Sequence, residues 1–391
     1  MLAIALYIPA VQNWVADKGS EIASEQTGMQ ISIGTIHIVW PLDVEITQCK
    51  VRSAQWQAVC DTLPDSPQFD IYLGRATVGW QPLALLDDNI DITNFEADSA
   101  DIKLDLNYEA PEDTTKTEIP YTILLNNANI TNLNLWMMMK GDSIPVTVNG
   151  LMTKVEEGVF DLGKQHYSVE TLLGEVKNFS GYGAKVDSLN LNVSGIDFAM
   201  QENENPQDTL VNLQLGIKNT GATIKTVSYD TYNVEGLRTK IENLSFALAD
   251  SKPLFSANIR ELALNEKSMG VDVKSLAANI KVDTTKVALD GTLATAASKI
   301  STHLNMDLSA LDETKTGNID ARVDASIGRS DVLNIARGLN IEGANELSDL
   351  LPAMPMTLTT EAHGNTKNLH FPYLNADIPT LASVDVRPFD L

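Results

Sequence analysis

The chain has 391 residues, 43% of them hydrophobic, so it is long enough for two or three domains and apolar enough to bury a substantial surface. Its 52 acidic and 28 basic residues give a formal net charge of -24. This charge excludes binding to nucleic acid through a basic face and attachment to anionic lipid by charge, so any contact with a membrane must be apolar.

The N-terminal segment is apolar but short. The run Met1–Val11 falls below the ~20 apolar residues that a membrane-spanning helix needs, and it lacks the basic leader and the cleavage site of a signal peptide. We expect it to be the distal end of a membrane-anchor helix, with a short core helix as the alternative. The expected membrane-proximal residues are Tyr7, Ile8, Val11 and Trp14.

An amphipathic helix is predicted from Pro9 to Gln26, because proline suits a first helical turn and apolar residues recur on one side. Trp14 lies where an aromatic residue would meet a membrane interface; the alternative is that it packs under the strands that follow. Gly28 marks the end of this helix, since glycine adopts a left-handed conformation at little cost. Alternating apolar residues then predict a first β-hairpin with a bulge at Gly34: Ile31, Ile33, Ile36, Ile38, Val44 and Ile46.

Both cysteines, Cys49 and Cys60, fall in one predicted hairpin. If its turn is centred on Ala54 and Gln55, the two residues face each other across the strands, close enough for a disulfide. A bond would indicate an oxidising compartment. The alternative is that both are small core residues.

Two stretches carry a family resemblance. The segment Pro9–Ile46, with its helix, its Thr-Gly pair and its first hairpin, resembles the N-terminus of AsmA-like proteins, especially the TamB type. The segment Leu73–Phe95 resembles the family's strand, Pro-Leu-Leu turn and following strand, although Ala84 interrupts the Pro-Leu-Leu. After a polar break, Ile119-Pro120-Tyr121 fits the start of a further family strand. The resemblance extends to about Leu106 and becomes diffuse beyond it.

This resemblance implies an inner-membrane-anchored, periplasmic protein of the bacterial cell envelope, related to chorein-type bridge-like lipid-transfer proteins. It implies a curled sheet, or β-taco, whose apolar groove carries phospholipid acyl chains between membranes and serves outer-membrane assembly. It also implies partnership with a BamA-like outer-membrane barrel, through a C-terminal region absent from this chain.

Four regions are predicted along the chain. Residues 1–28 hold the end of the anchor helix and the amphipathic helix, 29–108 the N-terminal β region, 109–118 a polar linker loop, and 119–391 an extended β-groove. A short helix is expected to begin at Ser330 or Asp331 and to end near Gly338, with another near residues 345–351. Because no closing signal precedes Leu391, we expect the chain to be cut within its array of strands.

Strands with one dry and one wet face dominate after the first helix. With few helices to cover a sheet, their apolar faces must meet each other or a ligand. We therefore expect a mainly β fold, built as an elongated curled sheet or half-open groove with an N-terminal helix and a few short helices. The residues expected to line the groove are Ile102, Leu104, Leu106, Leu189, Leu191, Val193, Leu213, Leu215, Leu304, Met306 and Leu308.

No catalytic or metal-binding constellation is found. The histidines lie in different predicted elements, without metal-ligand spacing to a cysteine or a carboxylate pair: His37, His166, His303, His363 and His370. His363 and His370 are the nearest pair, and the predicted turn between them argues against a shared site. There is no nucleophile elbow, P-loop or dinucleotide fingerprint. We expect no enzymatic activity, no metal and no cofactor.

Two functions of different class remain open. The apolar run Trp136–Met139 suits either an adaptable lipid-lining surface or an ordinary core. An unfilled apolar wall would make the chain a lipid conduit. Interlocked apolar faces would make it a non-enzymatic structural or adhesive all-β module with a dry core.

Overall fold

A computed structural model describes residues 9–39, 43–56, 64–109, 121–142, 144–202, 211–249, 252–312 and 314–391. Strands make up 68% of the described residues, and the 20 strands found there all belong to one open sheet that is not closed into a barrel. The predicted mainly β class, with one open sheet and few short helices, is confirmed. The chain divides into two compact units, Met1–Asn192 and Val193–Leu391, and the boundary falls inside strand β9.

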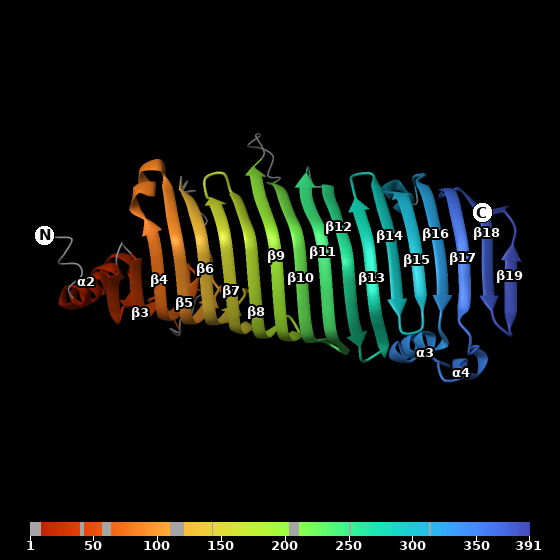
Figure 1. Cartoon of the computed structure of the whole chain (residues 1–391), viewed down its shortest axis with the longest axis horizontal. Helices are drawn as coiled ribbons and strands as arrows, with labels where there is room; N and C mark the ends of the chain where they lie inside the picture. Colours follow the sequence, from red (N-terminus) through yellow and green to blue (C-terminus); the bar gives the residue numbers. More distant parts are fainter. Residues whose placement is uncertain are drawn as a thin grey trace. The chain divides into compact units, whose positions relative to one another are not determined.

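The first unit begins with a helix and continues with strands that follow one another along the sheet (Figure 1). Its elements are α2 (Pro9–Thr27), β1 (Gln30–Ser32), β2 (Thr35–Val39), β3 (Asp43–Arg52), β4 (Gln68–Gln81), the 3-10 helix η1 (Pro82–Asp87), β5 (Asn89–Asp105), β6 (Thr122–Met138), β7 (Val146–Asp161), β8 (His166–Gly181) and the first part of β9 (Ala184–Glu202).

The second unit repeats antiparallel hairpins and adds two short helices at the ends of its strands (Figure 1). After the remainder of β9 its elements are β10 (Val211–Tyr229), β11 (Tyr232–Ala249), β12 (Lys252–Glu266), β13 (Val271–Val282), β14 (Lys286–Thr295), β15 (Lys299–Asp307), the 3-10 helix η2 (Leu308–Leu311), β16 (Asn318–Ile327), α3 (Arg329–Gly338), α4 (Leu347–Leu350), β17 (Met356–Asn365), β18 (Asn368–Ile378), β19 (Ala382–Val386) and β20 (Phe389–Asp390).

Helix α2 packs on the first strands through small and polar side chains. Gln12, Ala16 and Ser20 recur every four residues and are all buried. The Ser24 hydroxyl bonds both the N–H and the carbonyl of Ile31, at 3.0 and 3.3 Å. Near the start of the helix, Gln12 Oε1 lies 3.3 Å from Nδ1 of His37. The helix therefore begins beside β2 and runs back towards β1.

One strand pair breaks the hairpin pattern. Strands β5 and β6 pair in parallel, whereas the other pairings from β1 to β8 are antiparallel. The chain between a parallel pair must join opposite ends of the two strands, so it cannot be a tight turn. The predicted linker 109–118 falls in this connection, and residues 110–120 lie outside the described residues.

Residues with left-handed backbone inside the strands help to keep the apolar side chains on one side of the sheet. In β5, Ala97 and Ala100 are three positions apart, yet both are buried, at 5% and 1% exposure. Ser99 lies between them with a left-handed φ of +61, and this residue moves the alternation on by one position while the register with β4 and β6 is kept. The neighbouring Asp98 carboxylate accepts hydrogen bonds from Asn132 and Thr131 of β6, and these bonds lower its pKa.

In the second unit the helices cover strand ends. The buried Asp331 of α3 accepts hydrogen bonds from the hydroxyls of Thr295, the last residue of β14, and Ser298, in the turn before β15. Asn334 donates to the Gly270 carbonyl at 2.8 Å, in the turn before β13. Helix α3 is thereby held against turns, and it leaves the broad face of the strands uncovered.

Candidate functional site

An unbroken apolar row crosses the second unit. Seven side chains on consecutive strands face one another in register, and every one is half-buried: Leu215, Phe246, Phe255, Val282, Val287, Met306 and Ile319. A parallel row includes Ile280, Leu289, Leu304, Ala321 and Ala362. We call this side of the strands the apolar face of the second unit.

The first unit has an apolar face of the same kind. From β3 to β8 the register aligns Val51, Ile71, Ile102, Leu135, Val148 and Phe179, and all six are half-buried. Beside this row, Leu104 lies between Phe69 and Met137. Every second side chain of a strand points to the same side, so the alternation in the sequence produces this face directly.

No second layer packs on these faces among the described residues. Among the described residues, every large side chain keeps at least 2% of its surface exposed. The buried apolar residues are mostly alanines, such as Ala76, Ala97 and Ala278. In a β-sandwich the inner side chains of two sheets interdigitate and become fully buried. Half-buried rows are what one uncovered sheet face gives, because neighbouring strands shield each side chain only from its flanks.

The predicted lining residues lie on or beside these faces. Ten of them are half-buried and Val193 is buried, at 5% exposure. Ile102 and Leu104 belong to β5, Leu213 and Leu215 face Leu248 and Phe246 on β11, and Leu304 and Met306 face Leu289 and Val287 on β14. In β9, Leu189, Leu191 and Val193 occupy alternate positions, and Leu191 lies close to Gly174 of β8.

Two of the predicted residues lie just beyond a strand. Leu106 follows β5, where its N–H donates to the Met138 carbonyl at 2.8 Å. Leu308 is the first residue of η2, so the expected continuation of β15 to this leucine is wrong. The alternation persists there, but the chain leaves the sheet after Asp307.

The run Trp136–Met139 is divided between the two sides of the sheet. Met137 lies beside Leu104 on the apolar face. Trp136 faces Lys103 on the opposite side and meets the ring of Trp56 edge-on, with centroids 6.4 Å apart. Only part of this run can therefore contribute to an apolar lining.

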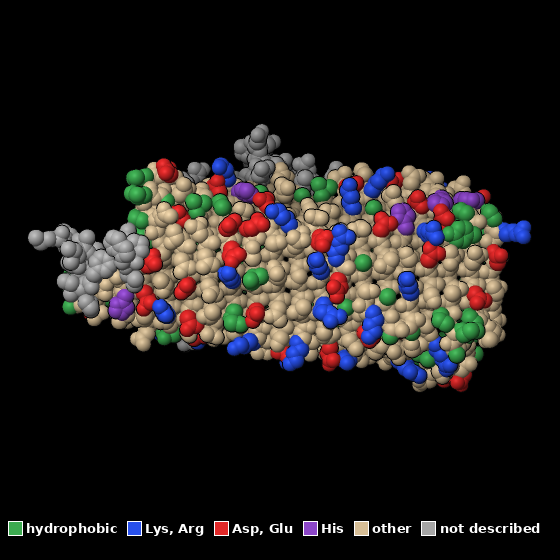
Figure 2. Space-filling model, viewed as in Figure 1, with side chains coloured by type: hydrophobic (Ala, Val, Ile, Leu, Met, Phe, Trp, Pro, Cys, Tyr) green, Lys and Arg blue, Asp and Glu red, His purple; other side chains and the backbone are tan. Residues whose placement is uncertain are grey.

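The other side of the sheet is polar, and we call it the wet face. Figure 2 shows this side, with Lys, Arg, Asp and Glu scattered over the strands and few hydrophobic side chains between them. In the second unit one row aligns Asn258, Asn279, Asp290, His303 and Arg322 across β12 to β16. The two sides of these strands thus differ sharply in chemistry.

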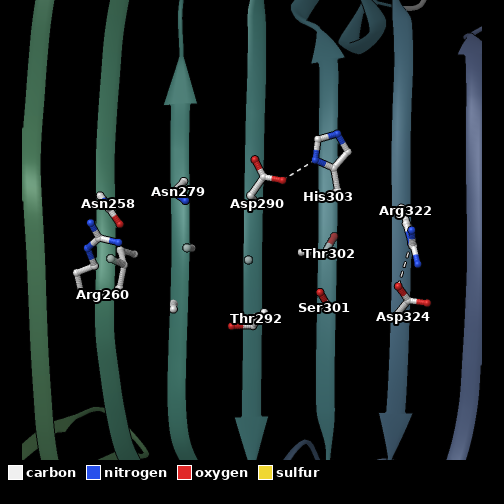
Figure 3. Close-up of a pocket in the computed structure, with 14 residues that line it drawn as sticks. Asn258, Arg260, Asn279, Asp290, Thr292, Ser301, Thr302, His303, Arg322 and Asp324 are labelled. Atoms are coloured by element: carbon white, nitrogen blue, oxygen red, sulfur yellow. Dashed lines mark hydrogen bonds and ion pairs between the residues drawn. The ribbon is translucent and has the colours of Figure 1, made fainter.

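A shallow depression of about 610 Å³ lies on this wet face (Figure 3). Its charged side chains are paired: Asp290 with His303, Asp324 with Arg322 at 3.0 Å, and Arg260 with Glu242 at 2.7 Å. The hydrogen bond that the His303 ring N–H donates to the Asp290 carboxylate raises the pKa of His303 above its ordinary value. Because each charge is already neutralised by a neighbour, these pairs resemble surface ion pairs of the sheet more than a site for a charged substrate.

The histidine pair near the C-terminal strands is closer than expected. The turn between β17 and β18 brings His363 directly opposite His370, so the turn joins this pair and does not separate it. His363 contacts Asp320 at 3.0 Å and Glu361, and His370 contacts Asp390 at 2.7 Å. In the part of the chain that the structure describes, no three histidine, cysteine or carboxylate side chains are placed to share a metal ion.

The expected hairpin register of the cysteines is wrong. Strand β3 pairs with β4, and Leu73 occupies the position opposite Cys49. Cys49 is half-buried, and this burial raises the pKa of its thiol. Cys60 lies outside the described residues, so the structure does not test a bond between the two.

The predicted membrane-proximal residues are described only in part. Tyr7 and Ile8 lie outside the described residues, Val11 is half-buried, and Trp14 is 62% exposed. Trp14 therefore does not pack under the first strands, which removes the alternative explanation for this residue. Of the helices described, none is long and apolar enough to span a bilayer.

Comparison of the chain with protein-family models, with curated proteins and with solved structures finds no match. The candidate site is therefore defined by its geometry alone: each unit has one apolar face with no layer packed on it among the described residues.

Proposed function

We propose that this chain is a lipid-carrying β-sheet protein whose apolar faces hold the acyl chains of phospholipids. The observation that carries this proposal is the half-burial of complete apolar rows, such as Ile71, Ile102 and Leu135, with no layer packed on them among the described residues. An exposed apolar surface of this kind is costly in water, so it marks a place where an apolar ligand binds.

Acyl chains suit this surface physically. Burial of a methylene group contributes ~0.8 kcal/mol, so a chain of ~16 carbons gains several kcal/mol from partial contact. The attraction is proportional to area and has no direction. Successive strands lie ~4.8 Å apart and offer similar rows, so a bound chain can shift from one row to the next without a large barrier.

The cellular setting in this proposal rests on the sequence resemblance to AsmA-like and TamB-like proteins. In that setting the N-terminus attaches to the inner membrane, the sheet lies in the periplasm, and phospholipid moves towards the outer membrane for envelope assembly. A BamA-like barrel is the proposed partner there. No catalytic step is part of this function.

Lipid analysis of the purified protein tests the proposal. We expect protein purified without detergent to carry phospholipid in at least about equimolar amount, because one apolar row runs from β3 to β8 and another from β10 to β16. Mass spectrometry of extracted lipid, normalised to protein, measures this. A monodisperse, lipid-free protein would instead favour a structural module whose faces are covered by another protein surface.

A further inference from the structure

The 3-10 helix η1 presents an unusual set of exposed leucines. Leu83, Leu85 and Leu86 are 76%, 44% and 82% exposed. The turn itself is well fixed: Pro82 begins it, Asp88 ends it in a left-handed conformation, and the Asp88 carbonyl accepts the N–H of Thr122 at the start of β6. The leucines thus project from an ordered turn that has no cover among the described residues.

Other apolar features lie at the same end of the first unit. Val44, near the start of β3, faces Val78, three residues before the end of β4. Helix α2 begins beside His37 on β2, so its first turn also lies towards this end.

The apolar face of the first unit reaches this end as well. Trp80 at the end of β4 faces Ile92, and Ile90 faces Ile123 on the next strand. Ile123 in turn faces Phe160, whose ring lies 6.4 Å from that of Tyr167. The helix η1 therefore lies at the end of the first unit where these apolar rows begin.

The charge around the turn selects its partner. The segment Pro82–Asp91 contains no lysine or arginine, and Asp87 and Asp88 directly follow the leucines. An anionic headgroup or an acidic peptide would be repelled there. The apolar side chains instead suit the acyl boundary of a bilayer, into which exposed leucines insert by area.

We propose that η1 is a membrane-insertion turn that seats this end of the first unit in a phospholipid bilayer of low surface charge. Its occupant is the bilayer surface itself, and the seated turn aligns the Trp80 and Ile90 rows with the acyl layer. This inference deepens the proposed lipid-carrying function, and the biological role of the insertion rests on that function. Binding of η1 to a bilayer is nevertheless measured separately from lipid carriage.

Vesicle flotation of the full chain tests the insertion. With phosphatidylcholine vesicles, the double variant Leu83→Asn and Leu86→Asn is expected to lower the bilayer partition coefficient at least about tenfold. The matched control is Leu311→Asn with Leu350→Asn, two leucines of similar exposure (70% and 60%) in short helices of the second unit. The control is expected to change partitioning by less than about twofold.

Lipid charge and salt give a second readout. Because the turn carries only acidic charge, adding phosphatidylglycerol should not strengthen binding, and raising the salt concentration should not weaken it. Unchanged partitioning in the η1 variant, absence of vesicle binding by the natural chain, or binding that requires anionic lipid and disappears in salt would each overturn the insertion, and the leucines would then serve a protein partner.

The two proposals fail in different ways. If the natural chain carries phospholipid but the η1 variant still partitions normally, the insertion fails and the lipid-carrying function stands. If the natural chain is lipid-free but the η1 variant loses vesicle binding, the insertion stands and the lipid-carrying function fails. The η1 variant should keep its bound lipid when both are correct, since the turn lies outside the rows.

Discussion

The double variant Leu289→Asp and Leu304→Asp is expected to stay folded and to lose roughly half of its bound phospholipid, since the first unit keeps its own apolar face. These leucines face each other on β14 and β15 and are half-buried. On an uncovered face the new carboxylates stay hydrated. In a sealed interior, an unpaired charge would cost about 3–5 kcal/mol or more and unfold the unit.

The matched control uses the same strands. Ala288 faces Asn305 on the wet face, one position away from each leucine. The control variant Ala288→Asp and Asn305→Asp adds equal charge to the other side of the sheet, so we expect its lipid content to stay unchanged. Thermal unfolding and phosphate assay of detergent-free protein measure both effects. If the leucine variant alone were unfolded at room temperature, the result would indicate a sealed, dry core and contradict the prediction.

Glu266→Gln is expected to destabilise the second unit by about 2 kcal/mol, because a buried charged acceptor is lost. Glu266 is 5% exposed. Its Oε1 accepts the N–H groups of Asn233 and Ser268, and its Oε2 accepts that of Met269. A glutamine would turn an amide N–H₂ towards one of these donors, and the turn that holds α3 would loosen.

The same carboxylate makes stability depend on pH. Burial alone would raise the pKa of Glu266, but the three backbone N–H groups outweigh it and lower the pKa. A group with a lowered folded-state pKa stabilises fully above its unfolded pKa, about 4.3, and loses this contribution as the pH falls through the folded-state value. Urea unfolding measured from pH 7 downwards should therefore show that the free energy of unfolding falls less with acid in the Glu266→Gln variant than in the natural chain. Equal acid sensitivity of both proteins would contradict this role.

Local patterns predicted much of the architecture. The helix predicted from Pro9 to Gln26 is observed as α2, Pro9–Thr27, and the short helix predicted from Ser330 or Asp331 to Gly338 is observed as α3, Arg329–Gly338. The alternation that selected Leu213, Leu304 and Met306 also placed them in apolar rows. Such features depend on side-chain periodicity and on residues near in sequence, which a single chain records directly.

Non-local features could not be predicted in the same way. The parallel pairing of β5 with β6 depends on which strands meet across a long connection. So does the position of Leu73, rather than Cys60, opposite Cys49 in the antiparallel pair of β3 and β4. A left-handed residue such as Ser99 shifts the alternation by one position, so strict periodicity assigns the residues beyond it to the wrong side of the sheet. The exposure of the η1 leucines was missed because a Pro-Leu-Leu pattern alone does not reveal what covers it.

Quenching of tryptophan fluorescence by phospholipid with brominated acyl chains tests the central claim most directly. Trp80 and Trp136 are both half-buried, but Trp80 faces Ile92 on the apolar face whereas Trp136 faces Lys103 on the wet face. Two variants, each keeping one of these tryptophans and carrying phenylalanine at the other four, are loaded with this lipid. Strong quenching of Trp80 with Trp136 unaffected is the expected result; equal quenching of both, or of neither, would contradict acyl-chain binding on the apolar face.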